Sequence, residues 1–492
     1  MRRRFLPLAS LAFLALLAAS CGSSPTSNTG GGSIPAGASL VRSGVVAFVS
    51  IDSDLGSSQW RQLDKLSQKF PGRDKAIARL QQELSKQGVD YTGDVKPALG
   101  PELDLAIVSG GTEASTRVVG LTKPDDAGKL KALVAKLNAS GTSGGRAVYR
   151  EVDGWYALSD SQAAISAALK GDQTALADDA SFKAALDRLP GDSLVRAYAD
   201  GQRLNALVSH AAASRGSGLG ASSLGLDTLK YLAASVSAEG SGLRIRGASS
   251  GGNFGAAEAT SKLIADVPED ALALLDFSGK GATDQLRTLR SNPQFGAALS
   301  RLEQQLGVTP EELLGLLSGE LAFYVRPGTV IPEFTIALQE RDVSSALATL
   351  DKLAAHLAAA SGGRVEPGTQ DGHAVKTVNL GKFAIHYGSV GGGKIVITTG
   401  VNGVADFGSS GSLPDSADFK EAKDAAGMPD SSGDVVYVDI KNLVPLLEGF
   451  ASLAGGNLPP DVSANLEPLR SFLAWSNGSS SERTYDAFLE IK

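Results

Sequence analysis

The pattern of apolar and polar residues in the second half of the chain is of two kinds, one typical of a helix and one typical of strands. After Asp342, apolar side chains recur every three or four positions, which is typical of one buried helix face. These positions are Val343, Ala346, Leu347, Leu350, Leu353, Ala354 and Leu357. Asp342 is a suitable N-cap, because its carboxylate can accept a hydrogen bond from a backbone N–H of the first turn. The pattern therefore predicts an amphipathic helix that begins after Asp342.

Short runs rich in β-branched and aromatic residues surround this helix. They cover residues 333–338, 374–378, 383–387 and 394–399, and glycine-containing turns separate most of them. Successive short strands with tight turns favour antiparallel pairing over a doubly wound parallel sheet. The predicted fold class is α+β, with a mainly antiparallel sheet packed with helices.

A second helix signal precedes the first of these strands. Thr309, Pro310 and Glu312 form a capping-box pattern with proline at the first helical position. Gly319 follows the apolar run and is predicted to close the helix, since glycine is common just beyond helix ends.

The sequence contains an internal repeat in collinear order. Residues 92–108 match 309–325, residues 181–185 match 418–422, and residues 191–200 match 433–439. Such self-similarity indicates repeated structural units. We expect one copy over residues 38–250, a linker over 251–261 and a second copy over 262–492.

A shorter pattern recurs within each copy. Pro35, Pro190, Pro268 and Pro429 each precede a short apolar run, then an acidic residue, then a helix-like pattern. We interpret this as a strand-to-helix unit that is used four times.

The N-terminus has the features of an export signal. Three arginines at positions 2–4 precede an apolar stretch over 5–19, which is short for a membrane span, and Cys21 follows as the only cysteine of the chain. This arrangement resembles the lipobox of bacterial lipoproteins, which implies cleavage after residue 20 and acylation of Cys21. Residues 21–37 are rich in glycine and serine and are predicted to form a flexible tether.

The charge balance narrows the choice of partners. The chain carries 46 Lys and Arg against 53 Asp and Glu, for a net charge of −7. Loss of the three signal arginines makes the mature chain more acidic, so binding to nucleic acid through a basic surface is disfavoured. Acylation of Cys21 would leave no thiol for a disulfide or a zinc site. The expected location is the extracytoplasmic face of the cell membrane, and the expected membrane contact is through the acyl chains on Cys21.

Residues 190–200 and 429–439 share the order proline, short strand, Tyr-x-Asp. They resemble a family of bacterial secreted lipoproteins, common in high-GC Gram-positive lineages, that is described only as a domain of unknown function. The resemblance would cover most of the mature chain. It implies no catalytic residues.

Two motifs suggest chemistry at first sight. Residues 247–251 fit the G-x-S-x-G pattern of a nucleophile elbow around Ser249, but the repeat places Ser249 in the linker between the copies. Residues 388–395 approach a phosphate-binding loop, but Ile395 replaces the required hydroxyl and a strand follows, so a hairpin turn is expected.

The four histidines lack the spacing of a zinc site. His356 is predicted to face solvent, and His373 and His386 fall in strands. We therefore expect no catalytic, metal or cofactor site.

These observations favour a non-enzymatic, membrane-anchored lipoprotein with a binding or scaffolding role in the cell envelope. Its ligand or partner would be an envelope protein or a lipid. Two alternatives remain open: a lipid or glycolipid carrier with an apolar cavity, and a serine hydrolase that uses Ser249.

Overall fold

The computed structural model describes residues 34–109, 116–139, 146–214, 226–252, 260–279, 301 and 303–492, apart from short gaps at 329–330, 382, 410, 454–455 and 480. Cys21, the signal segment and most of the predicted tether lie outside these residues. The described residues form two compact units, which we call unit 1 (up to Gly251) and unit 2 (from Gly252 to Ile491). Among the helices of the described ranges, none is both long and apolar enough to cross a bilayer.

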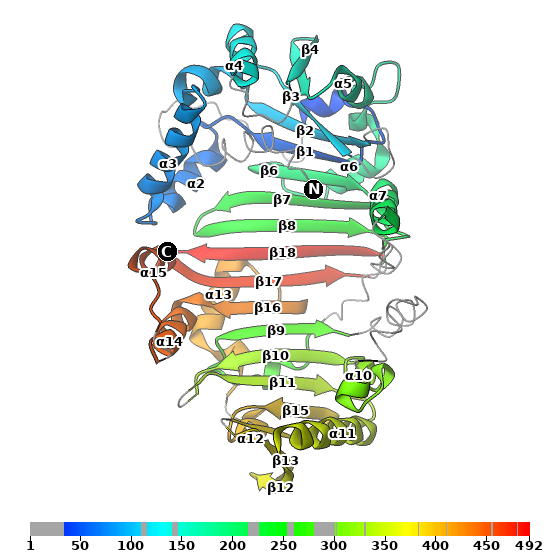
Figure 1. Cartoon of the computed structure of the whole chain (residues 1–492), viewed down its shortest axis with the longest axis vertical. Coiled ribbons are helices and arrows are strands. Elements are labelled where there is room, and N and C mark those ends of the chain that lie inside the picture. Colours follow the sequence, from blue (N-terminus) through cyan, green and yellow to red (C-terminus); the bar gives the residue numbers. More distant parts are fainter. Residues whose placement is uncertain are drawn as a thin grey trace. The chain divides into compact units, whose positions relative to one another are not determined.

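Unit 1 is built on an antiparallel sheet with the strand order β4-β5-β3-β2-β1-β6-β7-β8 (Figure 1). The strands are β1 Ala47–Asp52, β2 Glu102–Ser109, β3 Thr116–Thr122, β4 Val148–Val152, β5 Trp155–Ser159, β6 Val195–Asp200, β7 Tyr231–Glu239 and β8 Gly242–Ser250. The α-helices are α2 Ser58–Ser67, α3 Arg73–Lys86, α4 Ala127–Ala139, α5 Gln162–Ala168, α6 Ala180–Leu186 and α7 Gly201–Ser214. Short helical turns are η1 Ala36–Ser39, η2 Tyr91–Val95, η3 Lys96–Ala98 and η4 Leu176–Asp178.

Unit 2 has the strand order β12-β13-β14-β15-β11-β10-β9-β16-β17-β18, again antiparallel. The strands are β9 Ala273–Ser278, β10 Glu320–Arg326, β11 Glu333–Gln339, β12 Val365–Gln370, β13 His373–Asn379, β14 Ala384–Gly391, β15 Lys394–Thr398, β16 Gly433–Asp439, β17 Leu469–Gly478 and β18 Glu482–Ile491. The α-helices are α10 Pro310–Leu316, α11 Val343–Ser361, α12 Gly403–Asp406, α13 Ala417–Ala426, α14 Ile440–Leu453 and α15 Pro460–Leu466, and the short turns are η6 Ile264–Asp266 and η7 Leu413–Asp415. The α+β class and the antiparallel pairing predicted from the sequence are confirmed.

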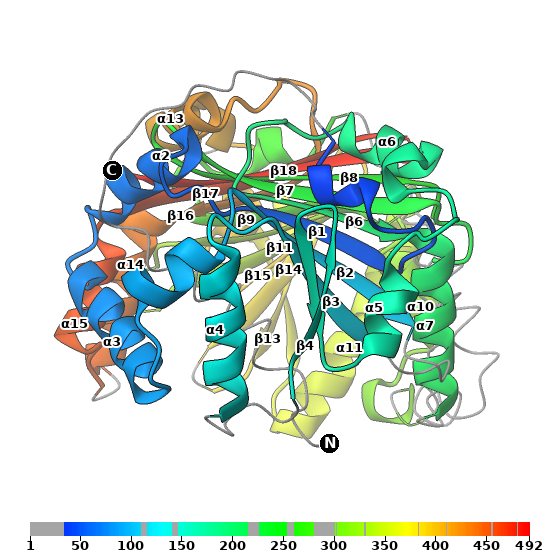
Figure 2. The same ribbon diagram turned by 90° about the horizontal axis from the view of Figure 1, so that it is seen from above.

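Successive residues of a strand point to opposite faces of the sheet. In both units apolar side chains lie on both faces, and helices cover each face. In unit 1, α5 and α6 pack on one face around Phe48 and Tyr198, and α4 packs with η2 and η3 against the other face at Tyr156. In unit 2, α13 packs on one face around Tyr437, and α10 and α11 cover the other face at Leu338. Figure 2 shows α6 and α4 on opposite sides of the strands of unit 1, and α13 and α11 on opposite sides of those of unit 2.

The same aromatic contact anchors a short helix to each sheet. Phe182 of α6 makes an edge-to-face contact with Tyr198 of β6, with ring centroids 5.1 Å apart. Phe419 of α13 meets Tyr437 of β16 in the same way at 5.0 Å. Both phenylalanine N–H groups donate to the N-cap side chain of their helix, Asp179 or Ser416, so capping and packing fix the same residue.

The strand-to-helix unit predicted after four prolines is present where the structure describes it. Strands β1, β6 and β16 lead into α2, α7 and α14. Strand β9 follows Pro268, but the segment after it lies outside the described residues.

The helix predicted after Thr309 is confirmed with its capping box, and Asp342 caps α11 as expected, with Oδ1 accepting from Ser345 N. The predicted role of Gly319 was wrong. Helix α10 ends at Leu316, and Gly319 instead lies against the neighbouring strand. A Cβ there would come within 1.9 Å of the Gln339 carbonyl oxygen, so close backbone approach requires glycine.

Candidate binding site

A cavity of about 1250 Å³ lies in unit 2, where β10 begins and β11 ends. Helix α10 and the first turns of α11 form its sides, and Figure 1 shows both helices beside the ends of these strands. Its position follows from the local sequence. Strand β11 ends at Gln339, Asp342 caps α11, and the two residues between them turn the chain across the mouth of the cavity.

Glu340 is the side chain that distinguishes this cavity. Its residue is only 9% exposed, and its Oε1 has no hydrogen-bond partner among the described residues. Burial alone raises the pKa of the Glu340 carboxyl to about 7, because a charged carboxylate is disfavoured away from water. No neighbouring cation offsets this effect. An unpaired buried acid beside a cavity is a typical feature of functional sites.

Several other polar groups of the cavity are held by the protein itself. Lys352 Nζ lies 2.5 Å from Glu312 Oε1, and Glu312 Oε2 accepts from Thr309 N in the capping box. Gln339 Nε2 donates to Gly392 O at 3.0 Å. Glu340 differs from these residues, because its Oε1 has no hydrogen-bond partner among the described residues; of the other lining residues, Glu320 shares this feature at Oε2.

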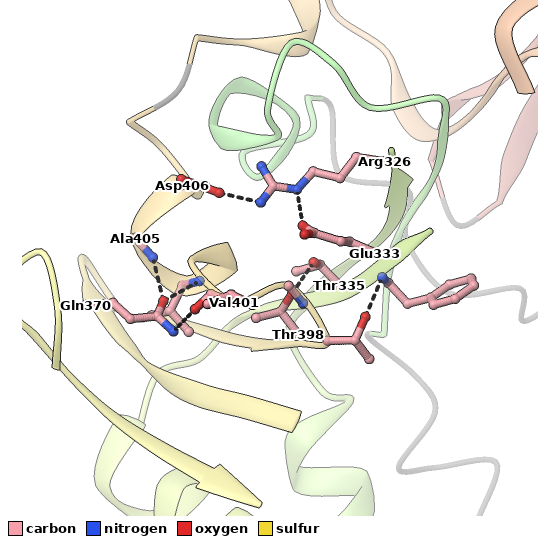
Figure 3. A network of polar contacts seen from close by, with 12 residues as sticks. Arg326, Glu333, Thr335, Gln370, Thr398, Val401, Ala405 and Asp406 are labelled. Carbon is pink, nitrogen blue, oxygen red and sulfur yellow. Dashed lines mark hydrogen bonds and ion pairs between the residues drawn. The ribbon is translucent and has the colours of Figure 1, made fainter. Parts of the chain in front are cut away.

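A second polar cluster lies at the opposite end of the β10–β11 pair (Figure 3). The buried Arg326 guanidinium bonds to Glu333, with Nε 2.7 Å from Oε2, and to Asp406. The Thr335 and Thr398 hydroxyls are 2.8 Å apart. Each of these side chains is bound by another part of the chain, so this cluster stabilises the sheet end and leaves no group for a ligand.

Gln370 extends that cluster toward α12. Its Oε1 accepts from Val404 N and Ala405 N, and its Nε2 donates to Val401 O at 2.6 Å (Figure 3). Both polar atoms of the amide are thus satisfied by backbone groups.

Buried carboxyl groups also occur beneath the first turn of each unit. In unit 2, Glu320 Oε1 accepts from Lys262 N at 2.6 Å and Leu263 N at 2.8 Å, and burial raises the pKa of nearby Asp276 to about 8. In unit 1, Glu102 Oε1 accepts from Gly37 N at 2.9 Å, and burial holds the pKa of Asp104 well above its usual range. The Glu320 and Glu102 carboxylates thus hold the backbone of the first turn of each unit.

The structure places Ser249 differently from the expectation based on the sequence. Ser249 was expected in a linker, but β8 continues through Ser250 and pairs Ser249 with Leu232. The Ser249 side chain is buried, and its Oγ has no hydrogen-bond partner among the described residues. A strand in place of the sharp strand-to-helix turn removes the geometry of a nucleophile elbow.

The expected hairpin and the expected positions of His356 and His386 are confirmed. Residues 388–395 form the hairpin between β14 and β15. His356 is exposed on α11, and His386 Nδ1 bonds to Thr377 Oγ1 at 2.9 Å across two strands. No group of three or more potential ligands that could hold a metal ion occurs among the described residues.

Glu340 was missed at the sequence level. It lies in a polar run between the strand expected over 333–338 and the helix expected after Asp342, where no motif singles it out. Residues of α10 complete the cavity beside it, and no local pattern reports that arrangement.

A protein family described as "Protein of unknown function (DUF3352)" matches residues 136–491, more than half of the chain. The chain belongs to this family. The match begins within α4 of unit 1 and includes every residue of the cavity described above. No curated protein and no solved structure matches the chain.

Proposed function

We propose that the protein is a lipid-anchored, extracytoplasmic binding protein whose unit 2 holds a polar ligand in the cavity at Glu340. The observation that carries the proposal is the unpaired, buried Glu340 carboxyl at the cavity. Burying such a group without a partner costs free energy, and a ligand that supplies the missing hydrogen bonds recovers it.

The character of the cavity favours this function over the lipid carrier. A lipid site requires a mainly aliphatic lining, whereas charged residues such as Glu311, Glu340 and Arg341 line this one. The hydrolase alternative has no support at Ser249, whose Oγ contacts no base among the described residues. Binding without catalysis thus remains the favoured role.

A cavity-blocking variant tests the binding role. A Cβ at Gly315 would meet no atom within 4 Å, and Gly315 lines the cavity, so Gly315→Trp should fill the space without disturbing the helix. We expect polar compounds that raise the unfolding midpoint of the full chain to lose this effect in Gly315→Trp. If every stabilising compound acts equally on the variant, the cavity is not the binding site.

Membrane attachment through Cys21 is part of the proposal. It rests on the arginines, the apolar stretch and the single cysteine of the N-terminus. Cys21→Ala should abolish incorporation of radiolabelled palmitate and block cleavage after residue 20. A variant that is still labelled and retained would contradict the anchor.

We further propose that units 1 and 2 are two copies of one ancestral unit. Support comes from the shared order of eight strands, from the Phe182–Tyr198 and Phe419–Tyr437 contacts, and from the glycine before β2. A Cβ at Gly100 would lie 1.8 Å from the Lys123 carbonyl oxygen, much as at Gly319. An experimental structure in which these eight strands fail to superpose would contradict the proposal.

A further inference from the structure

The cavity of unit 2 has an excess of hydrogen-bond acceptors. Ser318 and Thr349 line it, and their hydroxyl groups already donate to the backbone oxygens of Gly315 and Ser345 at 2.8 and 3.1 Å. Their oxygen lone pairs remain available, because a hydroxyl donates once and can accept twice.

Two donors of the lining are used within the chain in the same way. Gln339 Nε2 donates to Gly392 O, and Lys352 is paired with Glu312. Glu340 adds a carboxyl with an unpartnered Oε1. A ligand rich in donors would therefore complement these groups, whereas an anion would face them with like charge.

The formal charges point in the same direction. The described residues that line the cavity include five acidic side chains and three basic ones. The acids besides Glu340 are Glu311, Glu312, Glu320 and Asp342, and the bases are Lys262, Arg341 and Lys352. Lys352 is paired with Glu312, and among the described residues no ion pair joins Glu340 to any of these bases.

We propose that the cavity binds its ligand through a protonated amine, which donates hydrogen bonds to the Glu340 carboxylate and to the hydroxyl oxygens beside it. This inference rests on the proposed function of unit 2 as a binding unit. It specifies the ligand class as a cationic amine and gives Glu340 the role of its counter-ion.

Binding of this kind depends on pH in a defined direction. An alkylammonium ion stays charged up to pH 8, but Glu340 is ionised only above its pKa of about 7. Affinity should therefore rise about tenfold between pH 6 and pH 8. Asp276, with a pKa of about 8, titrates in the same range beneath Glu320, so the contribution of Glu340 must be isolated by substitution.

The test is isothermal titration calorimetry on the full chain with spermidine as the amine, maltotriose as a neutral polyol and citrate as an anion. Glu340→Gln keeps the size of the side chain and removes its charge. It should weaken spermidine binding about 10- to 100-fold at pH 8, which is typical of a lost charged hydrogen bond, and should abolish the Glu340 part of the pH dependence.

Glu467→Gln is the matched control, because it removes the same charge from an exposed position of unit 2 outside the cavity. It should change spermidine affinity less than threefold, since exposed charges interact weakly. Gly315→Trp leaves Glu340 intact and should block binding by occupying the cavity. Equal losses in Glu340→Gln and Glu467→Gln would show a general charge effect and overturn the inference.

The three probes separate the two levels of the argument. Binding of maltotriose or citrate that Gly315→Trp abolishes, without binding of spermidine, would retain the binding function and overturn the amine. Binding that Gly315→Trp leaves unchanged for every probe, or no binding of any probe, would overturn both. Spermidine binding that depends on Gly315 and Glu340 supports both.

Discussion

Units 1 and 2 both bury a carboxyl group beneath their first turn, but they place it on different strands. In unit 1 it is Asp104 of β2, which lies opposite Ser50 of β1. In unit 2 it is Asp276 of β9, which lies opposite Ala322 of β10. In each unit the acid thus lies in a pair between the first two strands, on the second strand in unit 1 and on the first in unit 2. Under our proposal that the units are copies of one ancestral unit, the buried acid is kept at this place while the strand that supplies it differs.

A second difference concerns the end of the third strand in each unit. Pro124 follows Lys123 in unit 1, and Glu340 follows Gln339 in unit 2, after the two residues whose carbonyls approach Gly100 and Gly319. Proline is a common stop after a strand and needs no partner. Glutamate at a buried position needs one. The comparison indicates that the shared residues hold the sheet, whereas Glu340 is a special feature of unit 2.

The largest expected effect concerns the aromatic contact shared by the units. Phe182→Ala and Phe419→Ala should each lower the free energy of unfolding of their own unit by about 3–5 kcal/mol, the usual cost of deleting a buried ring. Hydrogen exchange followed in peptides of each unit measures this. Losses that differ by more than about 2 kcal/mol would show that the two contacts are not equivalent.

The buried acids predict a fall in stability as pH rises. Asp276 has a folded pKa of about 8 against a usual value of 3.8, so the folded state binds more protons between these values. Unit 2 should then lose about 1.4 kcal/mol per pH unit, or about 2–3 kcal/mol between pH 5 and pH 7. Asp276→Asn should remove this contribution in unit 2, where the raised pKa of Glu340 adds a contribution of the same sign, and Asp104→Asn should remove that of Asp104 in unit 1.

Urea unfolding at pH 5, 6 and 7 gives the slope for wild type and both variants. Burial also raises the pKa of Asp104. The stability of both units should therefore fall as pH rises. A stability that rises with pH in either unit would contradict the proposed role of its acid.

Glycine replacement should have the next largest effect. Gly100→Ala and Gly319→Ala would place a Cβ within 2 Å of a backbone oxygen, and the strands would have to separate at a cost of about 1–3 kcal/mol. Gly315→Ala, where a Cβ meets nothing within 4 Å, is the control and should be neutral or slightly stabilising. Thermal unfolding of the three variants measures these costs. A loss of stability at only one of Gly100 and Gly319 would show that the two positions are not equivalent.

The smallest effect is expected from one ion pair in each unit, which joins α4 or α11 to a neighbouring helical segment. Lys136 lies 2.6 Å from Asp94 in unit 1, and Lys352 lies 2.5 Å from Glu312 in unit 2. Both lysines are substantially exposed, so Lys136→Met and Lys352→Met should each cost less than about 1 kcal/mol. A larger loss at Lys352 alone would show that the cavity wall depends on its pair.

Sequence patterns predicted the parts of the fold that depend on local chemistry. The capping box at Thr309 and the helix after Asp342 require only neighbouring residues, and the structure confirms both. Gly319 was misread because its reason lies across the sheet at Gln339. Ser249 was misplaced because the apolar pattern of its strand fades before Ser250, while pairing with β7 continues.

The candidate site could not be predicted in this way. The cavity beside Glu340 is formed jointly by residues of α10, α11 and the adjoining strand ends, and tertiary arrangements of this kind leave no spacing in the sequence. The excess of acceptors likewise depends on which hydroxyl groups donate to their own helix backbone, as Thr349 does.

The most direct test of the account is the titration of Glu340 itself. Carbon-13 NMR of the side-chain carboxyls in glutamate-labelled full chain, with Glu340→Gln to assign the signal, measures its pKa without and with spermidine. We predict a pKa of about 7 for the free protein and a fall of at least one unit with the amine bound. A pKa near 4.5 in the free protein, or a pKa that spermidine leaves unchanged, would contradict the proposal that Glu340 is the counter-ion of a bound amine.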